Sequence, residues 1–279
     1  MIVVTGATGN VGRTLVRLLA EEGHQVTAVS RRITDADVPS GVRAVAADLA
    51  DSPALPAFPA AMDAVFLMIG GDLMMSGDPA RVVAPFARAG RIVLLSSQGV
   101  ATRPDSPSHG RAFAAYEQAV MDSGTAWTIL RPGGFASNSY AWVPSVRAAR
   151  TVAAPFGDVP LPVIDPDDIA AVAAVALTRP GHEKAVYELT GPAATTPRER
   201  AGAIAEAIGE PLTFVDQTRD EARAQMLAFM PAPVADTTLD ILGAPTVRER
   251  TATTDVETLL GRPATPFTAW AARNAPAFR

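Results

Sequence analysis

The chain has 279 residues, of which 48% are hydrophobic, so it can bury a full core as one large α/β domain, with or without a cap. Its 24 basic and 29 acidic residues give a net charge of −5, which offers no reason to expect a nucleic-acid partner. The absence of cysteine excludes disulfides, thiolate nucleophiles and thiolate metal sites.

Histidine and lysine are scarce. The three histidines, His24, His109 and His182, are too far apart in sequence to show metal-ligand spacing, and Lys184 is the only lysine. No apolar run reaches the about 18 residues that a membrane helix needs, and Met1 leads straight into an apolar strand. We therefore expect a soluble, cytoplasmic protein without a metal or a membrane partner.

The chain begins with an apolar strand, a glycine-rich turn and a helix. Residues 2–4 are β-branched, and apolar residues recur with helical spacing within residues 14–22. Between them stand Gly6, Gly9 and Gly12, and glycine lets a diphosphate approach the unpaired amides of a first helical turn. The order of these elements predicts a dinucleotide-binding turn, with the spacing GxxGxxG in place of GxGxxG.

The rest of the first half alternates strands with helices. Strands are predicted at residues 26–29, 42–46, 64–69, 92–95 and 127–130, with helices at 79–89 and 111–123 among the segments between them. This alternation predicts an α/β fold, a doubly wound parallel Rossmann sheet with a small C-terminal substrate-binding lobe. Ligand-binding residues should follow the carboxyl ends of the strands.

Two arginines follow the second predicted strand. An NAD site places an acidic side chain there, whereas arginine accommodates the 2′-phosphate of NADP, and no acid occurs before Asp35. Arg31 and Arg32 therefore favour NADP(H), although such a pair can also be a solvated loop. Asp48, after the third strand, can accept a hydrogen bond from adenine or cap the next segment.

Several motifs together resemble one known family. They are TGATGNVG from Thr5, SRR from Ser30, DSGTAWTILRPGGF from Asp122 with Asn138, and YELTGP from Tyr187. The likeness covers residues 1 to about 209 and is to the NmrA-like branch of the atypical short-chain dehydrogenase/reductases. That family includes NADPH-dependent quinone and dye reductases, reductases of natural-product intermediates, and nucleotide-binding redox sensors.

The motifs and the strand ends give the predicted NADP(H)-binding set. It comprises Gly6, Thr8, Gly9, Asn10, Val11, Gly12, Arg31, Arg32, Asp48, Leu49, Gly70, Ser96, Pro132 and Gly133.

The usual proton relay of the superfamily is missing. Ordinary short-chain dehydrogenases use a serine after the fifth strand and a Tyr-x-x-x-Lys pair in which lysine lowers the tyrosine pKa. When Glu117 is matched to the glutamate that follows this pair in extended members, the tyrosine position falls on His109 and the lysine position on Phe113. The serine position falls on Ser97 or Gln98.

Three residues are candidates to replace the relay. His109 could act as an acid, because imidazole titrates near neutral pH, but it could equally be a solvated loop residue. Tyr116 shares a helix face with His109 if the helix extends that far, although a packing role is the alternative. Ser97 stands where it could touch substrate, and capping of the strand end is its alternative.

The segment after the sixth strand is rich in aromatic residues. Phe135, Tyr140 and Trp142, together with Asn138, are expected to line a site for a flat substrate, or else to pack in the interface of the lobe. Acids at 165, 167 and 168 are expected to cap a helix over residues 169–177, and a strand is predicted at 186–190. The predicted Rossmann part is 1–150 with about 186–192, and the predicted lobe is about 151–185 with 193–279, in one unit.

The sequence thus predicts an NADPH-dependent reductase of a small molecule. Without the lysine, a conjugated carbonyl, a quinone or an aromatic natural product is favoured as the acceptor, because hydride addition gives a delocalised anion. The alternative is a redox sensor that binds NADP(H) without turnover and acts on a protein partner. An isomerase that recycles its hydride is a third possibility, and a homodimer is left open.

Overall fold

The computed structural model describes residues 1–50 and 62–279, and they form two compact units. The first contains Met1–Pro132 and Pro166–Glu188, and the second contains Gly133–Asp165 and Leu189–Arg279. Within the described residues, no helix combines the length and the apolar character needed to span a membrane.

The first unit is built on a seven-stranded sheet in the order β3-β2-β1-β4-β5-β6-β8. Its strands are β1 Ile2–Thr5, β2 Val26–Ser30, β3 Arg43–Ala46, β4 Ala64–Met68, β5 Arg91–Leu95, β6 Ala126–Pro132 and β8 Ala185–Leu189. Its helices are α1 Asn10–Glu21, α2 Asp72–Ser76, α3 Pro79–Val83, α4 Gly99–Thr102, α5 Phe113–Asp122 and α7 Pro166–Thr178.

The strand order confirms the predicted doubly wound fold. Neighbouring strands from β3 to β6 pair in parallel, and Val3, for example, lies between Thr27 and Val65. The order reverses between β1 and β4, and ligands of such sheets bind beyond the carboxyl ends at this reversal. The central strands are apolar because helices cover both faces, and Val3, Val65 and Leu67 are completely buried.

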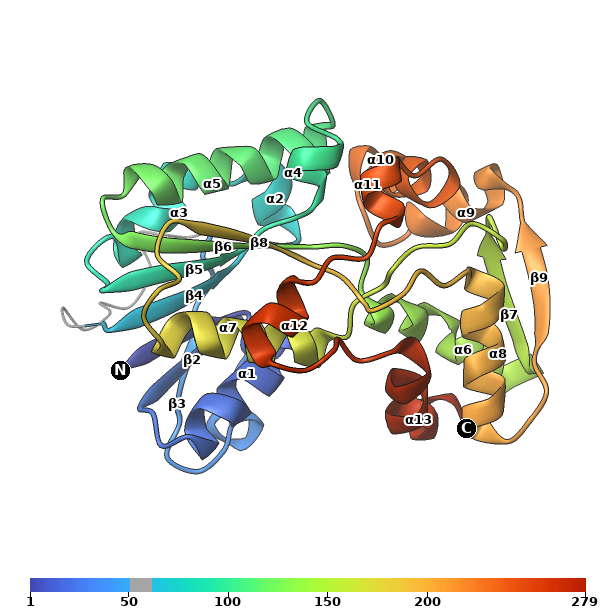
Figure 1. Ribbon diagram of the computed structural model, residues 1–279, viewed down its shortest axis with the longest axis horizontal. Helices are drawn as coiled ribbons and strands as arrows, with labels where there is room; N and C mark the ends of the chain where they lie inside the picture. Colours follow the sequence, from blue (N-terminus) through green and yellow to red (C-terminus); the bar gives the residue numbers. More distant parts are fainter. Residues whose placement is uncertain (51–61) are drawn as a thin grey trace. The chain divides into compact units, whose positions relative to one another are not determined.

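The two faces carry different helices (Figure 1). Helices α2, α3 and α5 lie over one face of the sheet, and α1 and α7 pack together over the other. The expected helix at 79–89 is shorter than predicted, since it ends as α3 and continues as a 3-10 turn at Ala84–Phe86. Pro85 explains the break, because proline has no N–H to donate to the preceding turn.

The acidic run lies at the start of α7. Asp167 and Asp168 lie in the first turn of this helix, where the helix dipole favours negative charge. Asp167 also accepts a hydrogen bond of 2.6 Å from the Thr14 hydroxyl on α1. This bond ties the two helices on that face of the sheet together.

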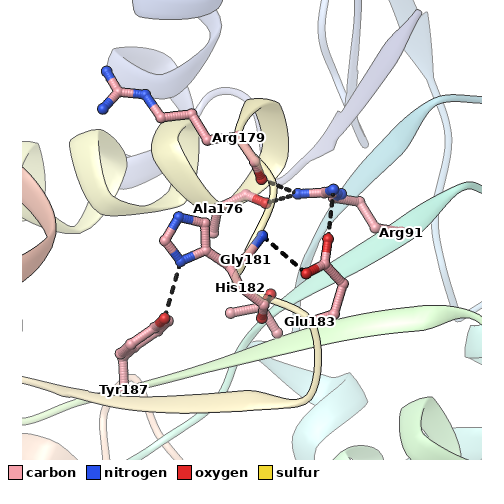
Figure 2. Close-up of polar contacts among 8 residues, drawn as sticks. Arg91, Ala176, Arg179, Gly181, His182, Glu183 and Tyr187 are labelled. Carbon is pink, nitrogen blue, oxygen red and sulfur yellow. Dashed lines mark hydrogen bonds and ion pairs between the residues drawn. The ribbon is translucent and has the colours of Figure 1, made fainter.

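Arg91 holds the far end of α7 at the start of β5 (Figure 2). Its guanidinium donates to the carbonyls of Ala176 and Arg179, and it pairs with Glu183 at 2.9 Å. His182 in the same turn contacts the Tyr187 hydroxyl through Nδ1 at 2.9 Å. Since Arg91 begins its strand, this cluster lies at the amino edge of the sheet, opposite the expected ligand site.

The second unit contains a two-stranded parallel sheet and most of the remaining helices. Its elements are a 3-10 segment at Ala136–Trp142, α6 Val143–Ala149, β7 Thr151–Pro155, α8 Pro197–Ile208, β9 Thr213–Gln217, α9 Arg219–Met226, α10 Ala232–Gly243, α11 Val247–Arg250, α12 Asp255–Leu260 and α13 Phe267–Phe278. Its core lies where α8, α13 and α6 meet, around Trp270 and Phe278.

The two units divide the chain differently from the predicted parts at three places. Residues 133–150 and about 189–192, expected in the Rossmann part, belong to the second unit, and residues 166–185, expected in the lobe, belong to the first. The physical reason is that α7 is a crossover helix, which covers the sheet and leads into its last strand. Strands β7 and β9 and helix α13 were not predicted.

We expect Arg91→Met to destabilise the protein. The substitution leaves two carbonyls at the end of α7 without a charged donor, which should cost about 2 kcal/mol and lower Tm by roughly 4–8 °C in a chain of this size. Thermal unfolding followed by circular dichroism measures the change. Arg88→Met is the control, because Arg88 is exposed, and equal Tm values for the two variants would refute the role of Arg91.

Candidate cofactor and active site

The glycine turn between β1 and α1 has no room for side chains. Gly6 has a φ of +63°, and a Cβ there would lie 2.1 Å from Cε of Met68. A Cβ on Gly12 would lie 2.2 Å from the carbonyl oxygen of Gly6. The first turn of α1 therefore packs directly on the end of β1, and the backbone is left open to a ligand.

The amino end of α1 can receive a diphosphate. Gly9 is the N-cap residue of α1, and no side chain caps the helix with a hydrogen bond. The first turn also contains no acidic residue. The amides of Asn10, Val11 and Gly12 have no acceptor within the helix, and the dipole there favours an anion. Thr8 adds a hydroxyl, which lies 2.8 Å from that of Ser30 at the end of β2. These residues fit the diphosphate of a dinucleotide.

The end of β2 carries two exposed cations. Arg31 and Arg32 are both solvent-exposed, so a phosphate group of a dinucleotide could reach them. Asp37 is engaged locally: hydrogen bonds from the backbone and then the hydroxyl of Thr34 lower its carboxyl pKa. Arginines at this strand end can accommodate a 2′-phosphate, which stays a prediction.

The next strand ends supply the remaining residues of the predicted nucleotide set. Asp48 is exposed, and its Oδ1 accepts from the Ala50 amide at 3.0 Å, which is the local capping contact that the sequence left as an alternative. Leu49 is buried and Gly70 is exposed. A bond from Asp48 to adenine stays a prediction.

A buried charged cluster fixes the end of β5. The Ser96 hydroxyl donates to Glu117 Oε1 at 2.5 Å, and Arg131 donates to both oxygens of Glu117 at 2.9 and 2.5 Å. Glu117 is 2% exposed, and its hydrogen-bonded carboxylate raises the pKa of Arg131. Because the Ser96 proton is committed to this carboxylate, Ser97 is the serine better placed to serve a substrate.

Ser97 and His109 meet around Gly99. The Gly99 amide donates to the Ser97 hydroxyl at 3.1 Å, and a Cβ on Gly99 would lie 2.5 Å from Cβ of His109. His109 lies in a π-helical segment, Pro107–Ala112, that runs into α5, and its Nδ1 is 2.9 Å from the Ser108 hydroxyl. Two of the three predicted catalytic residues are thus neighbours.

Tyr116 lies in the core of the first unit. It is 1% exposed, its hydroxyl donates to the Leu73 carbonyl at 2.8 Å, and burial raises its pKa to about 12. These contacts support the packing role. Phe113, at the position of the missing lysine, is also buried. The backbone amide of Lys184 donates a hydrogen bond to the Trp127 carbonyl near the start of β6. Lys184 therefore lies at the amino edge of the sheet.

The residues of the predicted loop after β6 lie where the chain passes from the first unit to the second, at Pro132 and Gly133, and within the second unit. The Pro132 carbonyl accepts from the Gln98 amide at 3.0 Å, and the Gly133 amide donates to Leu189 at 2.9 Å. Phe135 forms an isolated parallel β-bridge with Ile164, and the Asn138 side chain is exposed.

The other two aromatics of that segment pack within the second unit. Tyr140 donates to Asn274, and its ring centroid is 5.2 Å from that of Trp270. The Trp142 ring lies 5.9 Å from the guanidinium carbon of Arg200. For Tyr140 these contacts support the packing alternative.

Sequence reasoning missed three features of these sites. They are the Ser96–Glu117–Arg131 cluster, the Thr8–Ser30 contact and the burial of Arg200. The only sequence signals were a glutamate within an apolar helix and an arginine among small residues, and both patterns are common on solvated surfaces.

Comparisons with known proteins agree with this geometry. A family model described as NAD(P)H-binding matches residues 6–180. The chain is 40% identical to the (4-alkanoyl-5-oxo-2,5-dihydrofuran-3-yl)methyl phosphate reductase of Streptomyces griseus, over 100% of this chain and 99% of that protein. It is 34% identical to the NAD(P)H azoreductase of Xenophilus azovorans, with the same coverage.

Solved structures show the same fold. NADPH-dependent quinone oxidoreductase QOR2 of Escherichia coli, complexed with NADPH, has a TM-score of 0.77 at 24% identity, over 98% of this chain and 99% of that one. Triphenylmethane reductase of Citrobacter sp., complexed with NADP(H), has a TM-score of 0.79 at 20% identity, over 99% and 100%.

The glycine turn and the match across residues 6–180 lead to one conclusion. The chain belongs to the NAD(P)H-binding family of atypical short-chain dehydrogenase/reductases and is an NAD(P)H-dependent reductase.

Proposed function

We propose that the protein uses NADPH to reduce a conjugated carbonyl compound, of the quinone or natural-product type, without a Tyr-Lys pair. The observation that carries the proposal is the position of Lys184, which lies at the amino edge of the sheet, far from Ser97 and His109 at the other edge. A simple ketone needs a strong proton donor at its oxygen during hydride transfer. The described residues offer no lysine-activated tyrosine for that purpose.

The names of the relatives support the same class of acceptor. The Streptomyces griseus relative is named for an unsaturated lactone that carries a phosphate ester, and another relative of Escherichia coli is named a quinone oxidoreductase. In both compounds a carbon–carbon double bond is conjugated with a carbonyl group. We take a phosphorylated unsaturated lactone as the preferred substrate class for this chain.

The residues of the site would contribute as follows. Bound NADPH supplies a hydride to the acceptor. The hydride bonds to the β-carbon of the conjugated system, and the negative charge of the resulting enolate is shared by the α-carbon and the carbonyl oxygen, so a hydrogen-bond donor at that oxygen suffices to stabilise it. We propose that the Ser97 hydroxyl donates this bond and that the His109 ring or water supplies the proton.

The test of the proposed function is substrate scope. Purified protein with NADPH should reduce a 2-acyl butenolide and a quinone, and should leave cyclohexanone unreduced, when the loss of NADPH absorbance is followed. His109→Gln should lower kcat by roughly 100-fold, at the lower end of general acid catalysis. Tyr116→Phe is the control, and its pH profile should match wild type between about pH 6 and 9, because the buried hydroxyl stays protonated. Equal rates for cyclohexanone and the conjugated acceptors would refute the proposal.

NADPH preference should depend on the two arginines after β2. Arg31→Ala with Arg32→Ala removes two charge-assisted contacts of about 1.5–3 kcal/mol each, so the Kd of NADPH should rise by roughly 100-fold or more while that of NADH changes little. Fluorescence titration measures both constants. Arg43→Ala is the control, because Arg43 is an exposed arginine at the amino end of β3, away from the carboxyl end of β2 that carries Arg31 and Arg32. An unchanged NADPH Kd in the double variant would contradict this assignment.

Gly12→Ala should abolish tight binding of either nucleotide. Its Cβ would lie 2.2 Å from the Gly6 carbonyl oxygen, so the turn must open and the amides of α1 move away from the diphosphate. Gly202→Ala is the matched control, since a Cβ there meets nothing within 4 Å. Calorimetry should show wild-type affinity for the control, and the assignment fails if the Gly12 variant, still folded by circular dichroism, also binds normally.

A further inference from the structure

Arg13 is a cation at the end of a helix that disfavours cations. It is the fourth residue of α1 in the first unit, and its side chain is exposed, whereas Val11, Leu15 and Val16 are buried. The amino end of a helix carries a partial positive charge, and the first turn of α1 contains no acidic residue to offset it. A bound anion would remove this repulsion, so the position of Arg13 indicates an anionic ligand.

The side chain of Arg13 folds back over the glycine turn. Its Nη2 donates to the Thr8 carbonyl at 3.2 Å, as expected because helical side chains point toward the amino end of their helix. This turn is bonded to β2 in two ways. The Thr8 hydroxyl lies 2.8 Å from that of Ser30, and the Ala7 amide donates to the Val29 carbonyl at 3.1 Å. The Arg13 guanidinium therefore lies beside the end of β2, where the two arginines of the predicted nucleotide set follow.

The loop after β2 carries acidic residues that offset the arginine pair. Asp35 and Asp37 follow the pair, and the four charges cancel. The pKa of the Asp37 carboxyl is lowered, first by hydrogen bonds from the Thr34 backbone and hydroxyl and further by the positive charge of Arg13, which therefore lies nearby. Asp37 is thus ionised at neutral pH. With Arg13, three cations and two carboxylates leave one positive charge to attract an anion.

Arg17 shows how an arginine of the same helix is paired within the protein. It is exposed one turn after Arg13, and its Nη1 donates to both carboxylate oxygens of Glu21 at 3.0 and 2.9 Å. Arg13, Arg31 and Arg32 differ from it, because none of them forms an ion pair with any residue that the structure describes. The three cations around the end of β2 are therefore available to a ligand.

We propose that Arg13 is a third basic residue of the 2′-phosphate site and that it selects NADPH over NADH together with Arg31 and Arg32. The inference rests on the proposed function, in which NADPH is the hydride donor. A guanidinium has five N–H donors in a planar fork that matches the oxygens of a phosphate, and the bond to Thr8 engages only Nη2. Arg13 belongs to α1 and the other two arginines follow β2, so two separate elements would hold the phosphate.

Binding of two adenosine nucleotides tests the role of Arg13 without turnover. Adenosine 2′,5′-bisphosphate and 5′-AMP differ only in the 2′-phosphate, and calorimetry at fixed ionic strength measures both Kd values. Arg13→Gln should raise the Kd of the bisphosphate by roughly 10-fold, the loss of one charge-assisted contact, and leave the Kd of 5′-AMP unchanged. Arg17→Gln is the matched control, because it removes the same charge from the same helix, and it should leave both Kd values unchanged.

Two further readouts separate this role from a structural one. Arg13→Lys keeps the charge but loses the planar fork, so its Kd for the bisphosphate should lie between those of wild type and Arg13→Gln. The Tm of Arg13→Gln without ligand should equal that of wild type, because an exposed hydrogen bond and the repulsion by the helix dipole are lost together. A lower Tm with equal weakening of both nucleotides would assign Arg13 to the turn itself and overturn the proposal.

The same titrations separate the role of Arg13 from the proposed function. If Arg31→Ala with Arg32→Ala loses the preference for the bisphosphate while Arg13→Gln keeps it in full, Arg13 is not part of the site and the proposed use of NADPH stands. If wild-type protein binds the bisphosphate no more tightly than 5′-AMP, the proposed NADPH preference is wrong, and the role of Arg13 is overturned with it.

Discussion

The close packing of Gly12 on the carbonyl of Gly6 is the constraint on which the cofactor site depends. With only hydrogen atoms between the strand end and the helix, α1 can begin directly beyond β1 and present its unpaired amides at the reversal of the strand order. A side chain at either position would separate the two elements. The buried strands β1 and β4 then hold the turn rigid from behind, with Met68 packed against Gly6.

A second constraint acts at the neighbouring strand ends. The ion pair between Glu117 and Arg131 joins α5 to the end of β6, and the Ser96 hydroxyl brings in the end of β5. Breaking a buried pair of this kind by removing one partner typically costs about 3–5 kcal/mol. The cluster holds the backbone that carries Ser97 and leads to Gly99, where His109 packs. We therefore infer that it positions the candidate catalytic groups.

Much of the first unit could be predicted from the sequence, because its signals are local. Apolar strands, a glycine turn and helices of regular period lie in chain order, and the parallel sheet follows from them. The second unit was harder to predict. Strands β7 and β9 are five residues each and, among the described residues, pair only with one another, so long-range pairing and not local pattern decides them.

The site was predictable to the extent that it consists of backbone and motif. The glycine turn and the strand-end serines are placed where the sequence indicated, next to the expected sheet edge. The hydrogen-bond commitments of Ser96, Tyr116 and Tyr140 were not predictable, since their partners Glu117, Leu73 and Asn274 are distant in sequence. Burial of Arg200 likewise depends on packing between elements far apart in the chain.

Each unit is assembled from two separate stretches of chain, and the backbone passes between the units at residues 132/133, 165/166 and 188/189. During synthesis the sheet must therefore wait for β8, and the core around Trp270 and Phe278 must wait for α13. No single cut can release either half intact. Shortened versions that lack α13 should consequently expose apolar surface and aggregate rather than yield an isolated nucleotide-binding module.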